Sequence, residues 1–245
     1  MKTSTKLLLV GILILVASLA TYNVALRAEY NRGEFRNPYR DYSALTLRDF
    51  DEVELAPGSR LTVKIEAGPF AVRQHNKADS IQVVQTGRRL RIIDLAKQRN
   101  SRSHWTPNVV VVNCPRLAML LVNSSAAGVA QAPPAMPLNP DLPSAVVQLN
   151  GFHQDSLLLA ADQNASVELG QNQLGQLRVV AGTTPGSTAN VRIAKTNTIG
   201  AARLNFQHNS AFTLDAPTIS DLRYQFSDSV RATLPGAALR ALARE

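Results

Sequence analysis

Apolar and polar residues alternate in short stretches through most of this chain, and in the last third the pattern repeats. The segment 174–180 (Leu-Gly-Gln-Leu-Arg-Val-Val) is echoed by 199–206 and again by 219–226. Each copy is followed by a polar turn and a second short stretch, at 191–193, 212–214 and 232–234. Alternation with a period of two is typical of strands that bury one face. Strands that recur about every 20 residues predict a β-solenoid, in which each coil buries its apolar face against its neighbours.

The period of two also predicts which side chains point outward. In the aligned copies the predicted inward residues are Leu177, Val179, Ala202, Leu204, Phe206, Leu222, Tyr224 and Phe226. Arg178, Arg203 and Arg223 have the opposite parity. Because stacked strands lie about 4.8 Å apart, these three arginines are predicted to form an exposed column. In the second strand of each coil the predicted outward residues are Glu168, Arg192, Thr213 and Thr233.

The region before the repeat has the same character. Alternating stretches at 50–55, 61–65, 81–84 and 90–93 are separated by turn residues, including Pro57-Gly58 and Gly68-Pro69. Short strands with regular turns predict an all-β domain, which we place at 44–235. A polar segment, 99–107, and a proline-rich loop, 130–143, interrupt it. The tail, 236–245, alternates Ala and Leu with Arg, and is predicted to cap the last coil, whose open edge would otherwise invite strand addition.

The N-terminal segment, 1–26, predicts a membrane-spanning or signal helix. Lys2 and Lys6 precede an uncharged stretch from Leu7 to Leu26, about the 20 residues that a helix needs to span a bilayer. Two interpretations compete. Cleavage after Ala20 would remove the segment as a signal peptide. An anchor that is retained is favoured, because apolar residues continue past Ala20. Residues 27–43 then form a linker, and the β domain is exported and held at the cell envelope.

Net charge and aromatic content narrow the range of partners. The net charge of +8 fits either an anionic partner, such as a membrane surface or an acidic glycan, or a basic soluble exterior. No run of Lys and Arg is dense enough to overturn the second interpretation. Nucleic acid is not expected, because aromatic residues are scarce and no binding motif is present. The single cysteine, Cys114, ends an apolar run and is predicted to be a small buried side chain.

No motif for catalysis, metal binding or cofactor binding is found. The four histidines, His75, His104, His153 and His208, do not pair at metal-ligand spacing, so we expect no metal and no cofactor. Glycoside hydrolysis needs two carboxylates across a groove, and the outward columns supply no such pair. We therefore expect no enzymatic activity. The candidate ligand-binding residues are Arg178, Arg203 and Arg223, together with Trp105, which either stacks on a sugar ring or covers the edge of the first coils.

Several segments resemble one family of bacterial exported proteins. They are 49–55 (Asp-Phe-Asp-Glu-Val-Glu-Leu), Gly58, 61–65, 68–72, 81–83, 87–92 and 115–125. Together they are similar to the auto-transporter adhesin, head GIN domain family, over about residues 44–235. The resemblance implies a right-handed parallel β-helix and brings no catalytic residues. The turns at 123–128, 164–166 and 209–211 have few of the glycines usual in the family, which marks a divergent member.

The sequence therefore predicts a non-catalytic, envelope-anchored β-helix that binds or scaffolds a surface glycan or protein, as an adhesin does. One alternative is an extracytoplasmic sensor or envelope-stress accessory protein. A second is a carbohydrate-active β-helix enzyme, which a groove with paired carboxylates would favour. A flat flank lined by arginine would favour binding.

Overall fold

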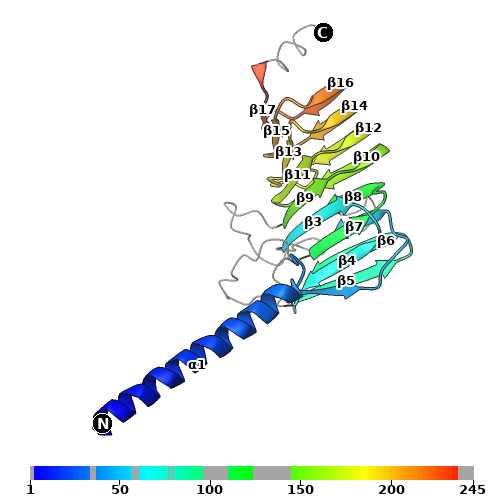
Figure 1. Ribbon diagram of the computed structural model, residues 1–245. Coiled ribbons are helices and arrows are strands. Elements are labelled where there is room, and N and C mark those ends of the chain that lie inside the picture. The colour runs from blue at the N-terminus through cyan, green and yellow to red at the C-terminus, as the bar shows by residue number, and fades with distance from the viewer. Residues whose placement is uncertain are drawn as a thin grey trace. The chain divides into compact units, whose positions relative to one another are not determined.

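A computed structural model describes residues 3–33, 37–56, 61–76, 78, 80–95, 110–123 and 145–236. The chain divides into two units, Met1–Tyr42 and Ser43–Glu245. The first contains the helix α1, Thr3–Arg32, and the second is built of β-strands (Figure 1). A mostly β protein with an N-terminal apolar helix is therefore confirmed. Trp105, the segments 99–107 and 130–143, and all of the predicted cap except Gly236 lie outside the described residues.

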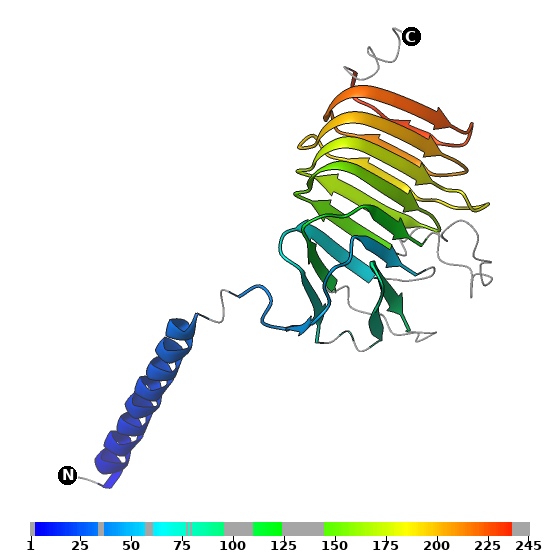
Figure 2. The same cartoon turned by 90° about the vertical axis from the view of Figure 1, so that its right-hand side faces the viewer.

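Helix α1 is long and apolar enough to cross a membrane. The apolar span, Thr5–Arg32, has 28 residues, and its side chains are exposed. The helix passes Ala20 without a break and continues beyond Leu26 to Arg32 (Figure 2). A signal sequence near the N-terminus would pass the same test of length and composition.

The β domain consists of two mixed sheets. Sheet A has nine described strands in the order β1 (Tyr42–Leu45), β4 (Ala71–His75), β7 (Val110–Cys114), β3 (Leu61–Ala67), β9 (Ala145–Asn150), β11 (Ala165–Gly170), β13 (Asn190–Ile193), β15 (Ala211–Leu214) and β17 (Arg231–Thr233). Sheet B has eight, in the order β16 (Thr218–Phe226), β14 (Thr198–Phe206), β12 (Gln173–Ala181), β10 (His153–Ala161), β8 (Met119–Val122), β2 (Glu52–Leu55), β6 (Arg89–Asp94) and β5 (Ile81–Thr86).

From β8 to β17 successive strands alternate between the two sheets, and each pairs in parallel with the strand one coil away. The register confirms the repeat alignment, since Leu177 pairs with Ala202, and Ala202 with Leu222. The coil from Gln173 to Thr198 is longer than the coil from Thr198 to Thr218, because it includes the turn 182–189.

The other end of the domain departs from the parallel pattern. Strand β4 pairs with β7, and β5 with β6, in antiparallel fashion. Both sheets are therefore mixed, and neither is closed. Alternation along a strand does not report the direction of its neighbour, so this difference was not visible in the sequence.

The core lies between the inner faces of the two sheets. Leu177, Val179, Ala202, Leu204 and Phe206 are all buried, as predicted. In the last coils the rings of Phe206, Phe212 and Phe226 cluster, with centroids 5.2 to 6.0 Å apart. Tyr224 differs from the prediction, because 47% of it is exposed. It lies on β16, the terminal strand of sheet B in the described part of the chain, so no further described strand covers it.

Buried amides join successive coils at a corner. The Asn172 side-chain amide donates to Leu149 O and to Asn197 Oδ1, both at 3.0 Å. Asn197 in turn donates to Leu169 O and Ala194 O, both at 2.7 Å. Leu169 O and Ala194 O also accept main-chain bonds, from Ala194 N at 3.0 Å and from Asn197 N at 3.2 Å, so the Asn197 amide adds a second bond to each carbonyl. The stacked asparagines therefore fix the corner of one coil above that of the next.

Candidate functional site

The three arginines of the repeat lie side by side on the outer face of sheet B. Arg178 of β12 pairs in register with Arg203 of β14, and Arg203 with Arg223 of β16. All three side chains are exposed, and the residues on either side of Arg178 and Arg203 point inward to the core. We call these three residues the arginine column. The side-by-side position of the three arginines, which the repeat alignment predicted, is confirmed. That the arginine column binds a ligand stays a prediction.

The charge of the arginine column is poorly compensated. Among the described residues, Arg178 and Arg203 have no ion-pair partner, and Arg223 contacts only Asp221, at 3.4 Å in an exposed pair. An exposed pair of this kind contributes about 0–1 kcal/mol, so it neutralises little. Stacked cations about 4.8 Å apart repel one another. The column is therefore a surface on which an anion would relieve repulsion.

The corresponding column on sheet A is arranged differently. Glu168 pairs in register with Arg192, and Arg192 Nη1 lies 3.8 Å from Glu168 Oε1. Arg192 also donates to Asp215 at 2.7 Å, and this hydrogen bond raises the pKa of the guanidinium. The guanidinium of Arg192 is thus flanked by two carboxylates. An external anion would therefore gain little binding energy at Arg192.

Amide side chains flank the arginine column on both sides. Gln176 lies two residues before Arg178 on the same face, and Asn205 and Gln225 lie two residues after Arg203 and Arg223. Amides donate and accept hydrogen bonds, so they suit the hydroxyl groups of a sugar. These three amides were not among the candidates predicted from the sequence, although their parity is the same as that of the arginines.

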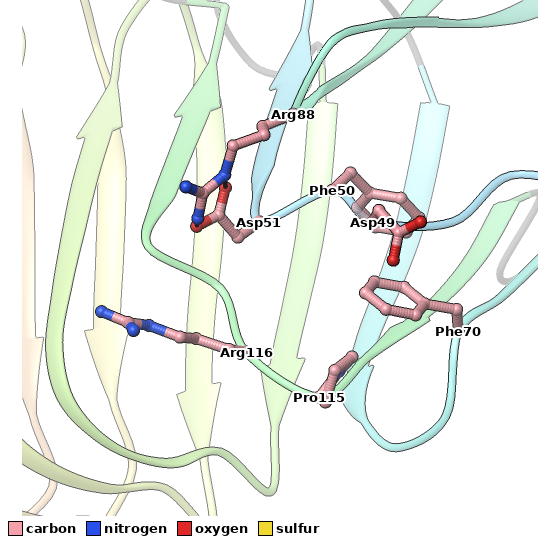
Figure 3. Close-up of a pocket in the computed structure, with 7 residues that line it drawn as sticks. All are labelled: Asp49, Phe50, Asp51, Phe70, Arg88, Pro115 and Arg116. Atoms are coloured by element: carbon pink, nitrogen blue, oxygen red, sulfur yellow. Dashed lines mark hydrogen bonds and ion pairs between the residues drawn. The ribbon is translucent and has the colours of Figure 1, made fainter.

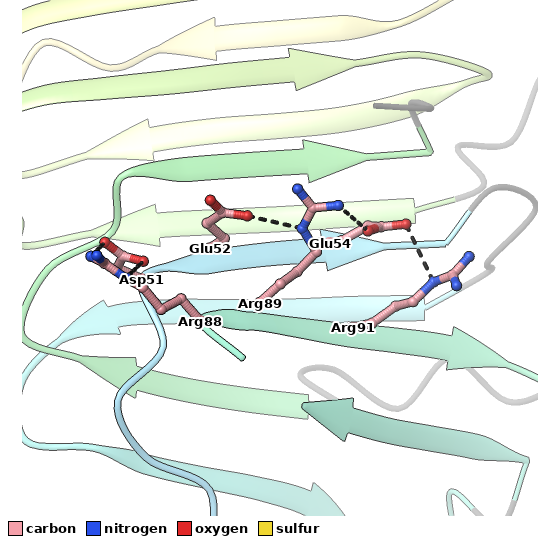
Figure 4. A network of polar contacts seen from close by, with 6 residues as sticks. All are labelled: Asp51, Glu52, Glu54, Arg88, Arg89 and Arg91. Atoms are coloured by element: carbon pink, nitrogen blue, oxygen red, sulfur yellow. Dashed lines mark hydrogen bonds and ion pairs between the residues drawn. The ribbon is translucent and has the colours of Figure 1, made fainter. Parts of the chain in front are cut away.

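A second charged cluster covers β2 and β6, and Figure 4 shows its contacts. Arg89 contacts Glu52 at 2.9 Å and Glu54 at 3.4 Å, and Arg91 contacts Glu54 at 3.3 Å. The hydrogen bond to Glu52 raises the pKa of Arg89. Each charge in this cluster is matched by a neighbour. The cluster joins two strands and leaves no cation for a ligand.

A shallow hollow of about 440 Å³ lies beside this cluster (Figure 3). Phe50 and Phe70 form its apolar part, with ring centroids 5.2 Å apart, and Pro115, Asp49 and Arg116 lie around them. The carboxylate of Asp51 is held by Arg88, whose Nε donates to Oδ1 at 2.9 Å. The hollow therefore offers one carboxylate without a described partner, Asp49. The two lining carboxylates, Asp49 and Asp51, do not form a catalytic pair, because Asp51 is bound to Arg88.

The described histidines, His75, His153 and His208, do not gather into a metal site. Within the residues that the structure describes, no group of three or more His, Cys, Asp or Glu side chains could hold a metal ion. His208 Nδ1 lies 2.6 Å from Gly182 O, which gives this ring a structural contact. His104, like Trp105, lies outside the described residues.

Cys114 is buried, and its environment keeps the thiol protonated. Burial, with a smaller contribution from the charge of Asp51, raises the pKa of the thiol to about 12. Because the thiolate is the reactive form, the native protein should resist alkylation at pH 8.

We expect iodoacetamide to modify Cys114 only after unfolding in guanidinium chloride, as measured by intact mass. Alkylation of the native protein at the rate of a free thiol would contradict this prediction.

The fold defines an all-β domain with an apolar helix before it. No family model matches the chain, and no curated protein matches it by sequence. Membership of the head GIN family is thus not shown.

Solved structures do show similarity. A protein described as a putative adhesin from Parabacteroides distasonis has a TM-score of 0.56 and 16% identity, over 78% of this chain and 71% of that one. A second protein described as a putative adhesin, from Bacteroides fragilis, has a TM-score of 0.46 and 13% identity, over 78% and 95%. A protein described as a putative lipid binding protein, also from P. distasonis, has a TM-score of 0.29 and 12% identity, over 79% of this chain and 96% of that one. The first similarity supports the fold alone, and the other two carry no argument.

Proposed function

We propose that this protein is a non-catalytic, envelope-anchored β-helix that binds acidic surface glycan through Arg178, Arg203 and Arg223. The observation that carries the proposal is the contrast between the two outer columns. Arg192 on sheet A is flanked by Glu168 and Asp215, whereas Arg178 and Arg203 on sheet B have no described anionic partner. A solvated surface gains nothing from stacking bare cations, but a polyanion that crosses the strands would contact all three.

The β-helix part of the proposal rests on chain order. From β8 to β17 the chain passes from one sheet to the other and returns to pair in parallel. Crossovers between parallel strands are right-handed in about 98% of cases, which favours a right-handed coil. A coil of this kind presents one residue per turn in a straight row, and the arginine column is such a row.

The ligand class follows from the chemistry of this face. Guanidinium groups bind carboxylates and sulfates in a two-point geometry. The amides of Gln176, Asn205 and Gln225 lie beside them and suit hydroxyl groups. Acidic polysaccharide carries both groups along one chain, whereas a neutral glucan lacks the charge.

The anchor and the cellular location complete the proposal. Helix α1 continues without interruption past the small residues at 18–20, which favours a retained anchor over a cleaved signal. A retained helix holds the β domain at the envelope surface where glycan is present. Fold similarity to a protein described as a putative adhesin supports the same assignment.

Substitution of the central arginine tests the binding role. We expect Arg203→Ser to weaken binding of the full chain, in detergent micelles, to immobilised polyuronate by about 1.4- to five-fold, since an exposed ion pair contributes about 0.2–1 kcal/mol. The triple variant of all three arginines should lose binding. Binding should weaken further as salt rises, because exposed charges are screened.

Arg192→Ser is the matched control, since it removes one exposed cation from the other sheet. It should leave polyuronate binding unchanged, and neutral glucan should bind neither protein. Equal binding by the wild type and the Arg203→Ser variant would show that the column is not the site. Absence of binding to any acidic glycan would overturn the glycan assignment and leave a protein partner as the next candidate.

A further inference from the structure

Strand β16 is a long edge strand whose outer side has no described neighbour. It spans Thr218–Phe226 and pairs only with β14 among the strands that the structure describes. Leu222 and Phe226 on this strand are only partly buried, and Tyr224 is exposed. An unpaired edge of this length is a template for another strand. The exposed edge of β16 therefore has the features of a protein–protein interface.

The charges on β16 limit what can pair with it. Asp221 and Arg223 lie on the outer face of the strand, and Leu222 between them points toward the core. In an antiparallel pair centred on Leu222, Asp221 of one copy lies opposite Arg223 of the other, and the same contact occurs twice. Centring the pair on Asp221 or on Arg223 would place like charges opposite each other. Centring it on Tyr224 would leave both charges opposite uncharged residues.

We propose that two copies of this chain associate edge to edge through β16, in antiparallel register about Leu222. Cross-strand pairs of opposite charge stabilise a sheet and like pairs destabilise it, so the charge pattern selects this register. A two-fold axis perpendicular to sheet B keeps the core faces of both copies on one side. Tyr224 of each copy then lies against the strand of its partner. The association does not depend on glycan binding.

Charge exchange tests the register. The full chain in detergent micelles is measured by analytical ultracentrifugation over a range of concentrations. Asp221→Arg should raise the dissociation constant of the dimer by about tenfold or more, because it replaces two attractions by two repulsions. The double variant Asp221→Arg/Arg223→Asp restores both attractions and should restore the dimer. Asp228→Arg, an equal charge change in an exposed turn beyond the strand, should leave it intact.

Disulfide trapping gives a second, independent readout. Leu222 lies on the proposed axis, so the Leu222→Cys variant should form a disulfide-linked dimer on mild oxidation. Facing residues of an antiparallel pair have Cα atoms about 4.5–5.5 Å apart, within the range that a disulfide spans. Tyr224→Cys should not, since Tyr224 lies opposite Ser220. Cys114 is buried and does not compete.

Three results would overturn the proposal. One is a wild-type protein that stays monomeric at every concentration. Another is cross-linking of Tyr224→Cys in place of Leu222→Cys, which would show a different register. The third is a monomer that dimerises only after deletion of residues 237–245, which would make the C-terminal segment the occupant of this edge.

Discussion

Replacement of Gly182 by alanine is expected to lower the free energy of unfolding of the β domain by a large amount. Gly182 follows β12 directly and has a φ of +72°, in the region that glycine tolerates and other residues avoid. A Cβ at this position would overlap Ser210 Oγ and the carbonyl oxygen of Gln207, which belong to the corner of the next coil. Main-chain atoms cannot move aside as a flexible side chain can.

The expected cost is about 4 kcal/mol or more, because backbone strain and steric overlap act together. The measurement is the free energy of unfolding in guanidinium chloride, followed by circular dichroism. Gly186→Ala is the matched control. Gly186 has a φ of +79°, but a Cβ added there would meet no atom within 4 Å, so only the strain of about 1–2 kcal/mol remains. Similar losses in the two variants would show that the corners are not in contact.

Phe212→Ala is expected to give the second large loss, about 3–5 kcal/mol, if the cavity does not collapse. Phe212 of β15 is 1% exposed and packs against Phe206, at 5.2 Å between centroids, and Phe226, at 6.0 Å. These rings join the two sheets across the last coils. Removing one leaves a void that the stacked strands around it cannot fill.

Thr213→Ala provides the comparison, since Thr213 is the next residue on β15 and points outward in register with Arg192. It should change the free energy of unfolding by less than about 0.5 kcal/mol. Differential scanning calorimetry on both variants would separate the two faces of β15. A loss below about 1 kcal/mol for Phe212→Ala, or equal losses for both, would contradict the inward assignment that the sequence predicted.

The repeat was the part of the fold that the sequence could predict. An inward apolar residue is followed directly by an outward arginine in each copy of the repeat, at Leu177-Arg178, Ala202-Arg203 and Leu222-Arg223. This shared order specifies the parallel register, because the inward apolar residues must stack on one another. That same spacing predicted the arginine column without any knowledge of the chain's path.

Other features depend on contacts that a linear pattern does not record. The antiparallel direction of β4 and β5 is one, and the ion pairs of Arg192 with Glu168 and Asp215 are another. At the corners, Asn164 takes a left-handed backbone, with a φ of +60°, and in a later corner His208 does so, with a φ of +52°. Polar composition predicts where a corner lies. Contacts with the neighbouring coils determine which residue of the corner has a positive φ.

The corner asparagines and the parallel register together have a consequence for how such a protein can change in evolution. The strands of each coil pair with those of the adjacent coils, and at the corner the Asn172–Asn197 hydrogen bond likewise joins adjacent coils. Tandem duplication of a segment such as 198–217 would therefore insert one more coil without altering the packing of the rest. Each inserted coil would add one arginine to the row, so the proposed glycan-binding surface could lengthen by gene duplication alone.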